Sequence, residues 1–245
     1  FLFNKTKEHS FAANHIYAIE RFSEILPGAL TWIGLTSPIW LSFTLPYAVA
    51  YLIILATAYW MINAIRLAVL LFLGYRKMEW AKSQPWLEKL KTDFPDKWQS
   101  YYHLIAIPTY KESLEVLEPA FQAIVNSNYP KDKIFLAVGF EDWANPEENQ
   151  RKIKHLQTYK THLAGVFATI HELLPGELKG PATNRNAILR NAAKELTNLK
   201  IKPEKVIVTT LDADFCIHPE FLSGALHKYL STPESKRDKR SYTGA

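Results

Sequence analysis

Cysteine is nearly absent from this 245-residue chain, and the few other absences are equally informative. A single thiol, Cys216, excludes an internal disulfide and fits a reducing compartment; we expect it to be buried and inert. Histidines such as His103, His171 and His218 lack the spacing of metal ligands, so no zinc site is expected. Neither glycine-rich nucleotide signature, G-x-G-x-x-G or the Walker motif, occurs, which excludes ordinary Rossmann dehydrogenases and P-loop enzymes.

Charge is absent from a long stretch: no Asp, Glu, Lys or Arg lies between Ala29 and Ile65. A run of this length is enough for two passes of a bilayer. We therefore expect a transmembrane hairpin over residues 29–74, with spans at about 29–43 and 47–73. The turn is expected near Pro46. The first span is short, so a re-entrant or tilted helix stays open as an alternative.

Basic residues flank the hairpin on both sides, so the positive-inside rule places both flanks in the cytoplasm. This predicts a multi-pass membrane protein in contact with lipids, with its remaining domain in the cytoplasm. Residues 1–28 have the spacing of an amphipathic helix, which Asn14 could cap. Residues 75–100 predict a linker helix at the level of the lipid headgroups, anchored by side chains such as Trp86, Leu90 and Trp98.

The net charge of +5 could indicate a nucleic-acid partner, but Lys and Arg are dispersed rather than gathered in one motif. Anionic lipid and phosphorylated substrates explain the excess equally well, and no nucleic acid is expected. The charge run Glu234 to Arg240 is expected to be a solvated loop.

Strand and helix patterns alternate over residues 101–245, which predicts an α/β domain with a mostly parallel sheet and flanking helices. Apolar β-branched runs predict strands, and 3.6-residue periodicity predicts helices. The expected strands are 103–107, 133–138, 165–171 and 205–211, and the expected helices are 114–126, 146–162, 184–198 and 219–230.

Two acids, Asp212 and Asp214, follow the apolar run 205–211 and fall at the carboxyl end of that strand. Ligands bind at this edge of open α/β sheets. Two carboxylates there could hold Mg²⁺ or Mn²⁺, which in turn holds a diphosphate. The alternative is a solvated loop whose acids cap a helix beginning near Pro219.

Further polar residues follow the other strands at the same predicted edge. Thr109, Tyr110 and Glu112 follow the first strand, and Glu141 and Asp142 end the second. A loop with Lys179 and Asn184 precedes a helix and suits phosphate oxygens. Each has an ordinary explanation as a turn or cap, but their convergence on one edge favours a binding site.

These residues resemble a family-2 glycosyltransferase with the GT-A fold, of the membrane-bound kind similar to cellulose and hyaluronan synthases. The run from Ile107 to Glu112 is similar to the family's Pro-x-x-Asn-Glu opening, and Asp212-Ala-Asp214 is similar to its DXD motif. The resemblance covers roughly residues 100–245. Lys111 stands where Asn is usual, and Glu141 stands where the first Asp is commoner.

The resemblance implies an enzyme that transfers a sugar from a nucleotide-diphospho-sugar, with a UDP-sugar expected, to a lipid or glycan acceptor. Transfer would be metal-assisted and inverting, at the cytoplasmic membrane face. The implied nucleotide-binding residues are Thr109, Tyr110, Glu112, Glu141, Asp142, Lys179, Asn184 and Asp212. Asp214, with Asp212, would ligate Mg²⁺ or Mn²⁺ bridging the phosphates.

The catalytic base of the family and its Gln-x-x-Arg-Trp motif do not occur after Asp214, where the later acids are Glu220, Glu234 and Asp238. We interpret Glu220 as a residue that interacts with the dipole of the next helix. The chain is therefore expected to hold the donor-binding half of the enzyme, without a base of its own and inactive alone.

Two other functions stay open. A sugar-nucleotide nucleotidyltransferase has a related sheet, but it opens with a glycine-rich phosphate loop that this chain lacks. A non-catalytic, membrane-anchored α/β scaffold would bind partners and no nucleotide. The donor sugar, the acceptor, processivity and oligomeric state are not predicted by the sequence.

Overall fold

The computed structural model describes residues 5–237, with side chains from residue 16 onward. The chain folds as two compact units, Phe1–Gly74 and Tyr75–Ala245. The boundary falls close to the predicted end of the membrane hairpin at residue 74.

The first unit consists of one long helix and most of a second, which ends in the second unit. Helix α1 extends over Lys5–Leu41 and α2 over Pro46–Lys82, so the chain turns where the sequence predicts, just before Pro46. Asn14 does not cap a helix, because α1 already begins at Lys5. α1 also continues through Pro27 and Pro38, each of which removes one helical hydrogen bond and distorts the helix locally.

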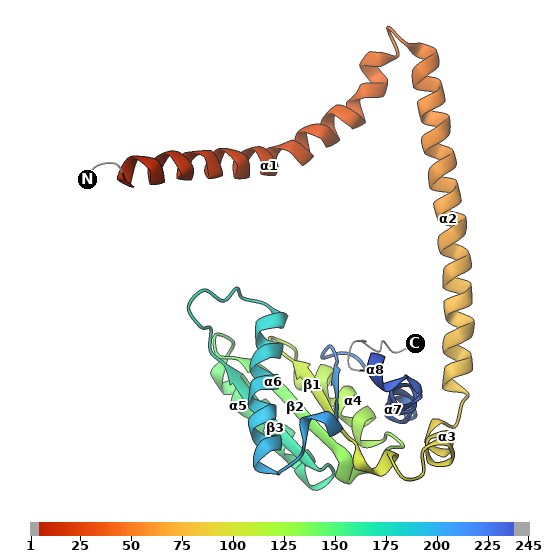
Figure 1. Ribbon diagram of the computed structural model, residues 1–245, viewed down its shortest axis with the longest axis vertical. Helices are drawn as coiled ribbons and strands as arrows, with labels where there is room; N and C mark the ends of the chain where they lie inside the picture. Colours follow the sequence, from red (N-terminus) through yellow and green to blue (C-terminus); the bar gives the residue numbers. More distant parts are fainter. Residues whose placement is uncertain (1–4, 238–245) are drawn as a thin grey trace. The chain divides into compact units, whose positions relative to one another are not determined.

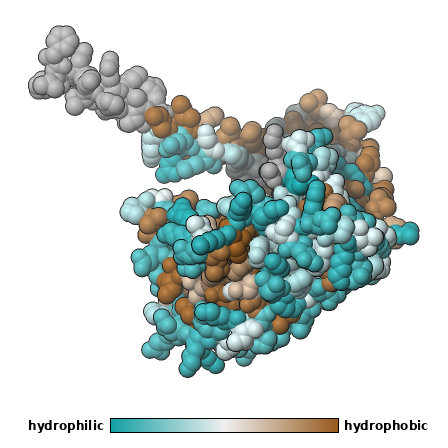
Figure 2. All heavy atoms as spheres, turned by 60° about the horizontal axis from the view of Figure 1, so that its bottom comes forward, coloured by the Kyte–Doolittle hydropathy of each residue, from teal (hydrophilic) through white to brown (hydrophobic). Residues whose placement is uncertain are grey.

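Large apolar side chains are exposed along both helices, for example Trp32 at 69% and Leu71 at 65%. Within residues 5–237, α2 is the one helix long and apolar enough to cross a membrane. The predicted first span, 29–43, is the last part of α1 and the turn after it. By contrast, hydrophilic side chains cover most of the visible face of the α/β unit, with hydrophobic ones gathered in one area (Figure 2).

A four-stranded sheet in which all neighbours are parallel forms the centre of the second unit, and Figure 1 shows its arrangement. The strand order is β3-β2-β1-β4. Each strand lies where the sequence predicts: β1 Tyr102–Pro108, β2 Ile134–Glu141, β3 Gly165–His171 and β4 Val206–Thr210. The α/β class and the parallel sheet are therefore confirmed.

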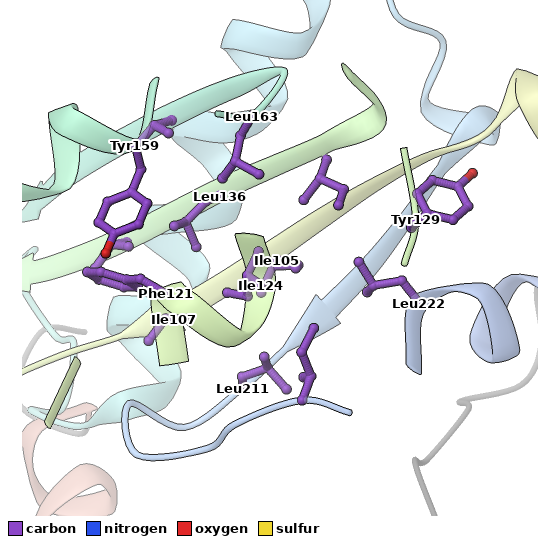
Figure 3. Close-up of a cluster of buried hydrophobic side chains, with 14 of the residues drawn as sticks. Ile105, Ile107, Phe121, Ile124, Tyr129, Leu136, Tyr159, Leu163, Leu211 and Leu222 are labelled. Carbon is purple, nitrogen blue, oxygen red and sulfur yellow. The ribbon is translucent and has the colours of Figure 1, made fainter. Parts of the chain in front are cut away.

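Helices cover both faces of the sheet, which is why the strands are continuously apolar rather than alternating. Leu104 and Ala106 face α6 (Pro181–Asn198), while Ile105 and Ile107 face the opposite side. The opposite layer is built from α3, α4, α5 and α7. These helices are Trp86–Asp93, Leu114–Val125, Pro146–Gln157 and Phe221–Ser231. Figure 3 shows Phe121, Ile124 and Leu222 of that layer beside the strands.

Three expectations about this unit are wrong. Leu90 and Trp98, expected at the lipid headgroups, are buried in the core, because their apolar faces pack on the α/β unit instead. Cys216 is exposed rather than buried. The charge run begins with a short helix, α8 (Glu234–Arg237), and its remaining residues lie outside the described part.

Candidate functional site

A pocket of about 380 Å³ lies at the carboxyl ends of β1 and β2, beside the start of α6. Parallel strands bring the loops after them to one edge, so segments distant in the sequence meet here. The lining consists of Pro108, Thr109, Tyr110, Glu112, Glu141, Trp143, Lys179, Gly180, Pro181 and Asn184. The structure thus brings together the three loops that the sequence singled out.

The wall after β1 is held by the backbone of β2. Both the backbone N and Oγ1 of Thr109 donate to the carbonyl oxygen of Gly139, each at 2.8 Å. Thr109 is 3% exposed, so these hydrogen bonds are shielded from water. Next to it, Glu112 accepts a hydrogen bond from the Tyr110 backbone N at 2.6 Å, which closes the turn. Thr109 and Glu112 therefore shape this wall as well as line it.

Asn184, near the start of α6, connects that helix to both strand ends. Its Nδ2 donates to the carbonyl oxygens of Thr109, at 3.0 Å, and of Gly139, at 3.4 Å. Only a glycine fits at position 139, since an added Cβ would lie 2.1 Å from Asn184 Oδ1 and 2.5 Å from Ile188 Cγ1. The sequence predicted that Asn184 belongs to the site, and the structure shows that it fixes the geometry of the two loops.

The wall formed by the end of β2 contains a buried pair of a carboxylate and a histidine that the sequence did not reveal. Glu141 Oε2 lies 2.7 Å from His171 Nδ1, and Glu177 Oε2 lies 3.3 Å from His171 Nε2. Burial raises the pKa of Glu141, against the opposing effect of His171. Burial lowers the pKa of His171, but hydrogen bonds and charge from both carboxylates outweigh it and raise the pKa overall.

Position at the carboxyl end of a strand, the criterion that identified Glu141 and Asp212, also identifies His171. It is the last residue of β3 and so lies at the same edge of the sheet. The sequence analysis considered histidines only as metal ligands, but a histidine can also contribute to a site through hydrogen bonds alone.

Aromatic rings form the mouth of the pocket. The centroids of Tyr110 and Trp143 lie 6.5 Å apart, and Trp143 contacts His171 edge-on at 5.7 Å. Lys179 Nζ lies 5.2 Å from the Trp143 centroid, a cation–π distance. Trp143 is a lining residue that sequence reasoning missed, since a lone tryptophan after an acidic pair has no pattern of its own.

Asp142 does not line the pocket; its backbone N donates to the carbonyl oxygen of His171 at 3.1 Å. Its carboxylate is exposed and contributes to the raised pKa of Glu141. The structure therefore places it at the rim, beside the acid that does line the wall.

Asp212 and Asp214 do not line the pocket either. They follow β4, the neighbour of β1, and so lie at the same edge of the sheet. Asp212 is exposed, and Asp214 is exposed as well, while Leu211 and Ala213 beside them are buried, so the two carboxylates face solvent together. Among the side chains described, those of residues 16–237, no three from His, Cys, Asp or Glu are grouped to hold a metal. Hard oxygen donors of this kind suit Mg²⁺ or Mn²⁺ if a diphosphate and water complete the ligand set.

Glu220 makes two contacts that the sequence did not predict. It precedes α7, but its Oε2 accepts from the backbone N of Leu87 at 2.8 Å, at the start of α3. Its Oε1 accepts from Asn128 Nδ2 at 2.6 Å. The carboxylate thus joins α3 and the residue Asn128 to the start of α7. Because Glu220 is the N-cap residue of α7, its expected interaction with the dipole of that helix stays a prediction.

No protein-family model matches the chain, and no curated protein matches its sequence. Among solved structures, S. aureus TarS residues 1–349 matches with 21% identity and a TM-score of 0.39, over 51% of this chain and 31% of that one. The same protein in complex with UDP-GlcNAc matches with 19% identity and a TM-score of 0.37, over 51% and 30%.

The mannosyltransferase PcManGT from Pyrobaculum calidifontis, in complex with GDP-Man and Mn²⁺, matches with 18% identity and a TM-score of 0.38. That match covers 66% of this chain and 40% of the other. This chain thus corresponds to less than half the length of each of these proteins. Matches with such low identity and coverage do not indicate a function for this chain, so the pocket itself has to be considered.

Proposed function

We propose that the α/β unit binds the nucleoside diphosphate of a nucleotide-diphospho-sugar, as the donor-binding part of a family-2, GT-A type glycosyltransferase. The observation that carries the proposal is the pocket, in which three separate loops place an aromatic mouth, a buried carboxylate and a lysine around one space. The sugar would pass to a lipid or polysaccharide acceptor at the cytoplasmic membrane face.

The base and ribose have a suitable wall in Thr109, Tyr110 and Glu141. A flat ring can stack on Tyr110 or Trp143, a contact worth roughly 1–3 kcal/mol per base. Glu141, which is 3% exposed, offers a carboxylate whose desolvation strengthens any hydrogen bond to a base or ribose. Together these groups recognise a planar polar ring followed by hydroxyls.

The negative charge of the diphosphate would be neutralised by Lys179 and by a divalent ion. Lys179 lies at the mouth of the pocket, directly before the start of α6, where backbone N–H groups also favour anions. Asp212 and Asp214 face solvent after the neighbouring strand and would hold the divalent ion. A bound Mg²⁺ or Mn²⁺ would act there as a Lewis acid and neutralise charge on the phosphates.

In the proposed transfer, an acceptor hydroxyl oxygen attacks the anomeric carbon of the donor sugar. The bond between that carbon and the diphosphate oxygen breaks, and the nucleoside diphosphate leaves. The hydroxyl proton must pass to a general base. Glu220 does not serve as that base, because both of its oxygens are engaged with Leu87 and Asn128. The residues assigned above bind and orient the donor, and none of them is assigned as the base.

Calorimetric titration of the detergent-solubilised chain with UDP and with GDP, with and without Mn²⁺, tests the proposal. We expect metal-dependent binding that Asp214→Ala abolishes, with no loss of stability because Asp214 is exposed. Asp96→Ala, another exposed aspartate, is the matched control and should bind as the parent does. Absence of binding to the folded parent chain with either nucleotide would contradict the proposal.

We propose further that α1 and α2 form a membrane hairpin that keeps the α/β unit in the cytoplasm. The support is the exposed apolar surface of both helices and the basic residues on each side. Cys216 offers a direct test, because it is the one cysteine of the chain and is exposed in the α/β unit. A membrane-impermeant maleimide should label it in inside-out vesicles and leave it unlabelled in right-side-out ones; the reverse pattern would refute this topology.

A further inference from the structure

We propose that His171 is a positioning residue for donor binding: it ties the loop 172–180 to the sheet edge and thereby sets Lys179 at the pocket mouth. This inference rests on the proposed function for its consequence, but the tie itself can be measured without any nucleotide. It names a residue that neither lines the pocket nor belongs to the predicted set.

A carboxylate oxygen lies within hydrogen-bond distance of each ring nitrogen of His171. Nδ1 faces Glu141 Oε2 at 2.7 Å, and Nε2 faces Glu177 Oε2 at 3.3 Å. Ionised carboxylates only accept hydrogen bonds, and a neutral imidazole donates from only one nitrogen. The arrangement therefore fits a protonated ring held between two acids, with His171 and Glu141 each 3% exposed.

Glu177 is the point at which the loop 172–180 is held. Its Oε2 also accepts from the Leu174 backbone N at 3.1 Å, and its own backbone N donates to the Leu174 oxygen at 3.0 Å. Gly176, with φ of 86°, closes this turn in a conformation that favours glycine. Leu178 is 84% exposed, so apolar packing contributes little to order there. Polar contacts to His171 therefore matter for the position of the loop.

Lys179 is linked to the same assembly. Its Nζ lies over the Trp143 ring at 5.2 Å, and Trp143 in turn contacts the His171 ring at 5.7 Å. When the loop is tied down, the ammonium group is held over the pocket mouth. When the tie is lost, Lys179 must be ordered again each time a diphosphate binds, which weakens affinity.

Charged groups of every neighbouring element act on this histidine directly or through its partners. Glu141 and Glu177 favour the protonated ring, Asp142 raises the pKa of Glu141, and Arg190 lowers the pKa of Glu177, while Lys179 lies over the Trp143 ring. The raised pKa of His171 agrees with two bound carboxylates outweighing burial.

Deprotonation should break the weaker of the two contacts. The neutral ring keeps one donor, and the 2.7 Å bond to buried Glu141 is the better retained, because Glu177 can exchange its bond for water. A raised folded-state pKa means that this stabilisation is present at low pH and is lost as pH rises through that pKa. The loop should therefore be ordered below the pKa of His171 and loosened above it.

Amide hydrogen exchange of the full chain in detergent tests the tie. Peptides covering 172–180 are followed between about pH 5.5 and 8.5, around the ordinary histidine pKa of about 6.5, and corrected for intrinsic exchange. We expect protection in the parent chain to fall as pH rises, and Glu177→Gln to lack that protection throughout. His155→Gln removes a comparable histidine–carboxylate pair, with Glu118 at 2.6 Å, and should behave as the parent does.

Calorimetric UDP affinity with Mn²⁺, over the same pH range, tests the positioning role. The titration of UDP itself affects both chains equally, so it cancels when the UDP affinity of the parent is divided by that of Glu177→Gln. This affinity ratio should fall roughly five- to tenfold from low to high pH. Equal protection of the loop in both chains would overturn the tie. A changed protection with a constant affinity ratio would overturn the positioning role. If the folded parent bound neither UDP nor GDP, the proposed function and the role of His171 in it would both fail, while exchange would still report the tie; a parent that binds only GDP is titrated with GDP instead.

Discussion

Replacing Gly139 with alanine tests whether the junction of β1, β2 and α6 determines the shape of the pocket. The added Cβ would lie 2.1 Å from Asn184 Oδ1 and 2.5 and 2.6 Å from two carbon atoms of Ile188. All three distances are far below a van der Waals contact, so α6 or the end of β2 must move. Movement would break the hydrogen bonds from Asn184 to the carbonyl oxygens of Thr109 and Gly139.

Two contributions set the magnitude. Overpacking a tight core costs about 1–3 kcal/mol, and losing a buried hydrogen bond costs about 0.5–1.5 kcal/mol. We therefore expect Gly139→Ala to lower the free energy of unfolding by about 1.5–4.5 kcal/mol. Nucleotide affinity should fall as well, because Thr109 lies in the pocket wall and moves with the junction.

Urea unfolding of the chain in detergent, followed by tryptophan fluorescence, measures the change. Gly180→Ala is the matched control, because a Cβ there meets no atom within 4 Å, and it should be nearly neutral. In the double variant Gly139→Ala/Asn184→Ala the worst contact is gone, so the two costs should not add, with a coupling of about 0.5–3 kcal/mol. Additive costs, or a stable Gly139→Ala chain, would refute the reasoning.

Other predictions concern single side chains. Glu220→Ala should cost about 1–3 kcal/mol of stability, because Leu87 N and Asn128 Nδ2 lose their acceptor, and leave nucleotide affinity intact; weaker UDP binding at full stability would contradict this. Burial lowers the pKa of His103 to about 3, so stability should fall with decreasing pH by up to about 1.4 kcal/mol per unit below about 6.5. His103→Phe should remove that part of the slope in urea midpoints. Lys179→Gln should weaken UDP binding about tenfold without changing the urea midpoint, since the side chain is exposed; unchanged affinity would exclude Lys179 from the site.

Local patterns in the sequence predict the elements of the α/β unit well. The strands are apolar because both faces are covered, and that property is written in consecutive residues such as Val206 to Leu211. The edge where the pocket lies follows from the same pattern, since parallel strands bring their carboxyl ends together. The loops containing Thr109, Glu141 and Lys179 can therefore be grouped from the sequence alone.

Pairing between distant residues could not be predicted in this way. His171 lies between Glu141 and Glu177 only because β3 pairs with β2 in register, Glu141 opposite His171. The partners of Glu220, in α3 and after α4, are likewise contacts across the fold. Sequence spacing contains no information about which of many acids such a side chain will meet.

The sequence by itself determined the alternation of strands and helices, the long uncharged stretch and the edge of the sheet where polar residues gather, because each depends on neighbouring residues. Only the tertiary structure decided which side chains are buried there. Amphipathic segments can face lipid or a protein core equally well, so Leu90 and Trp98 were assigned to the wrong surroundings. Burial and partner choice depend on long-range packing, which one-dimensional periodicity does not contain.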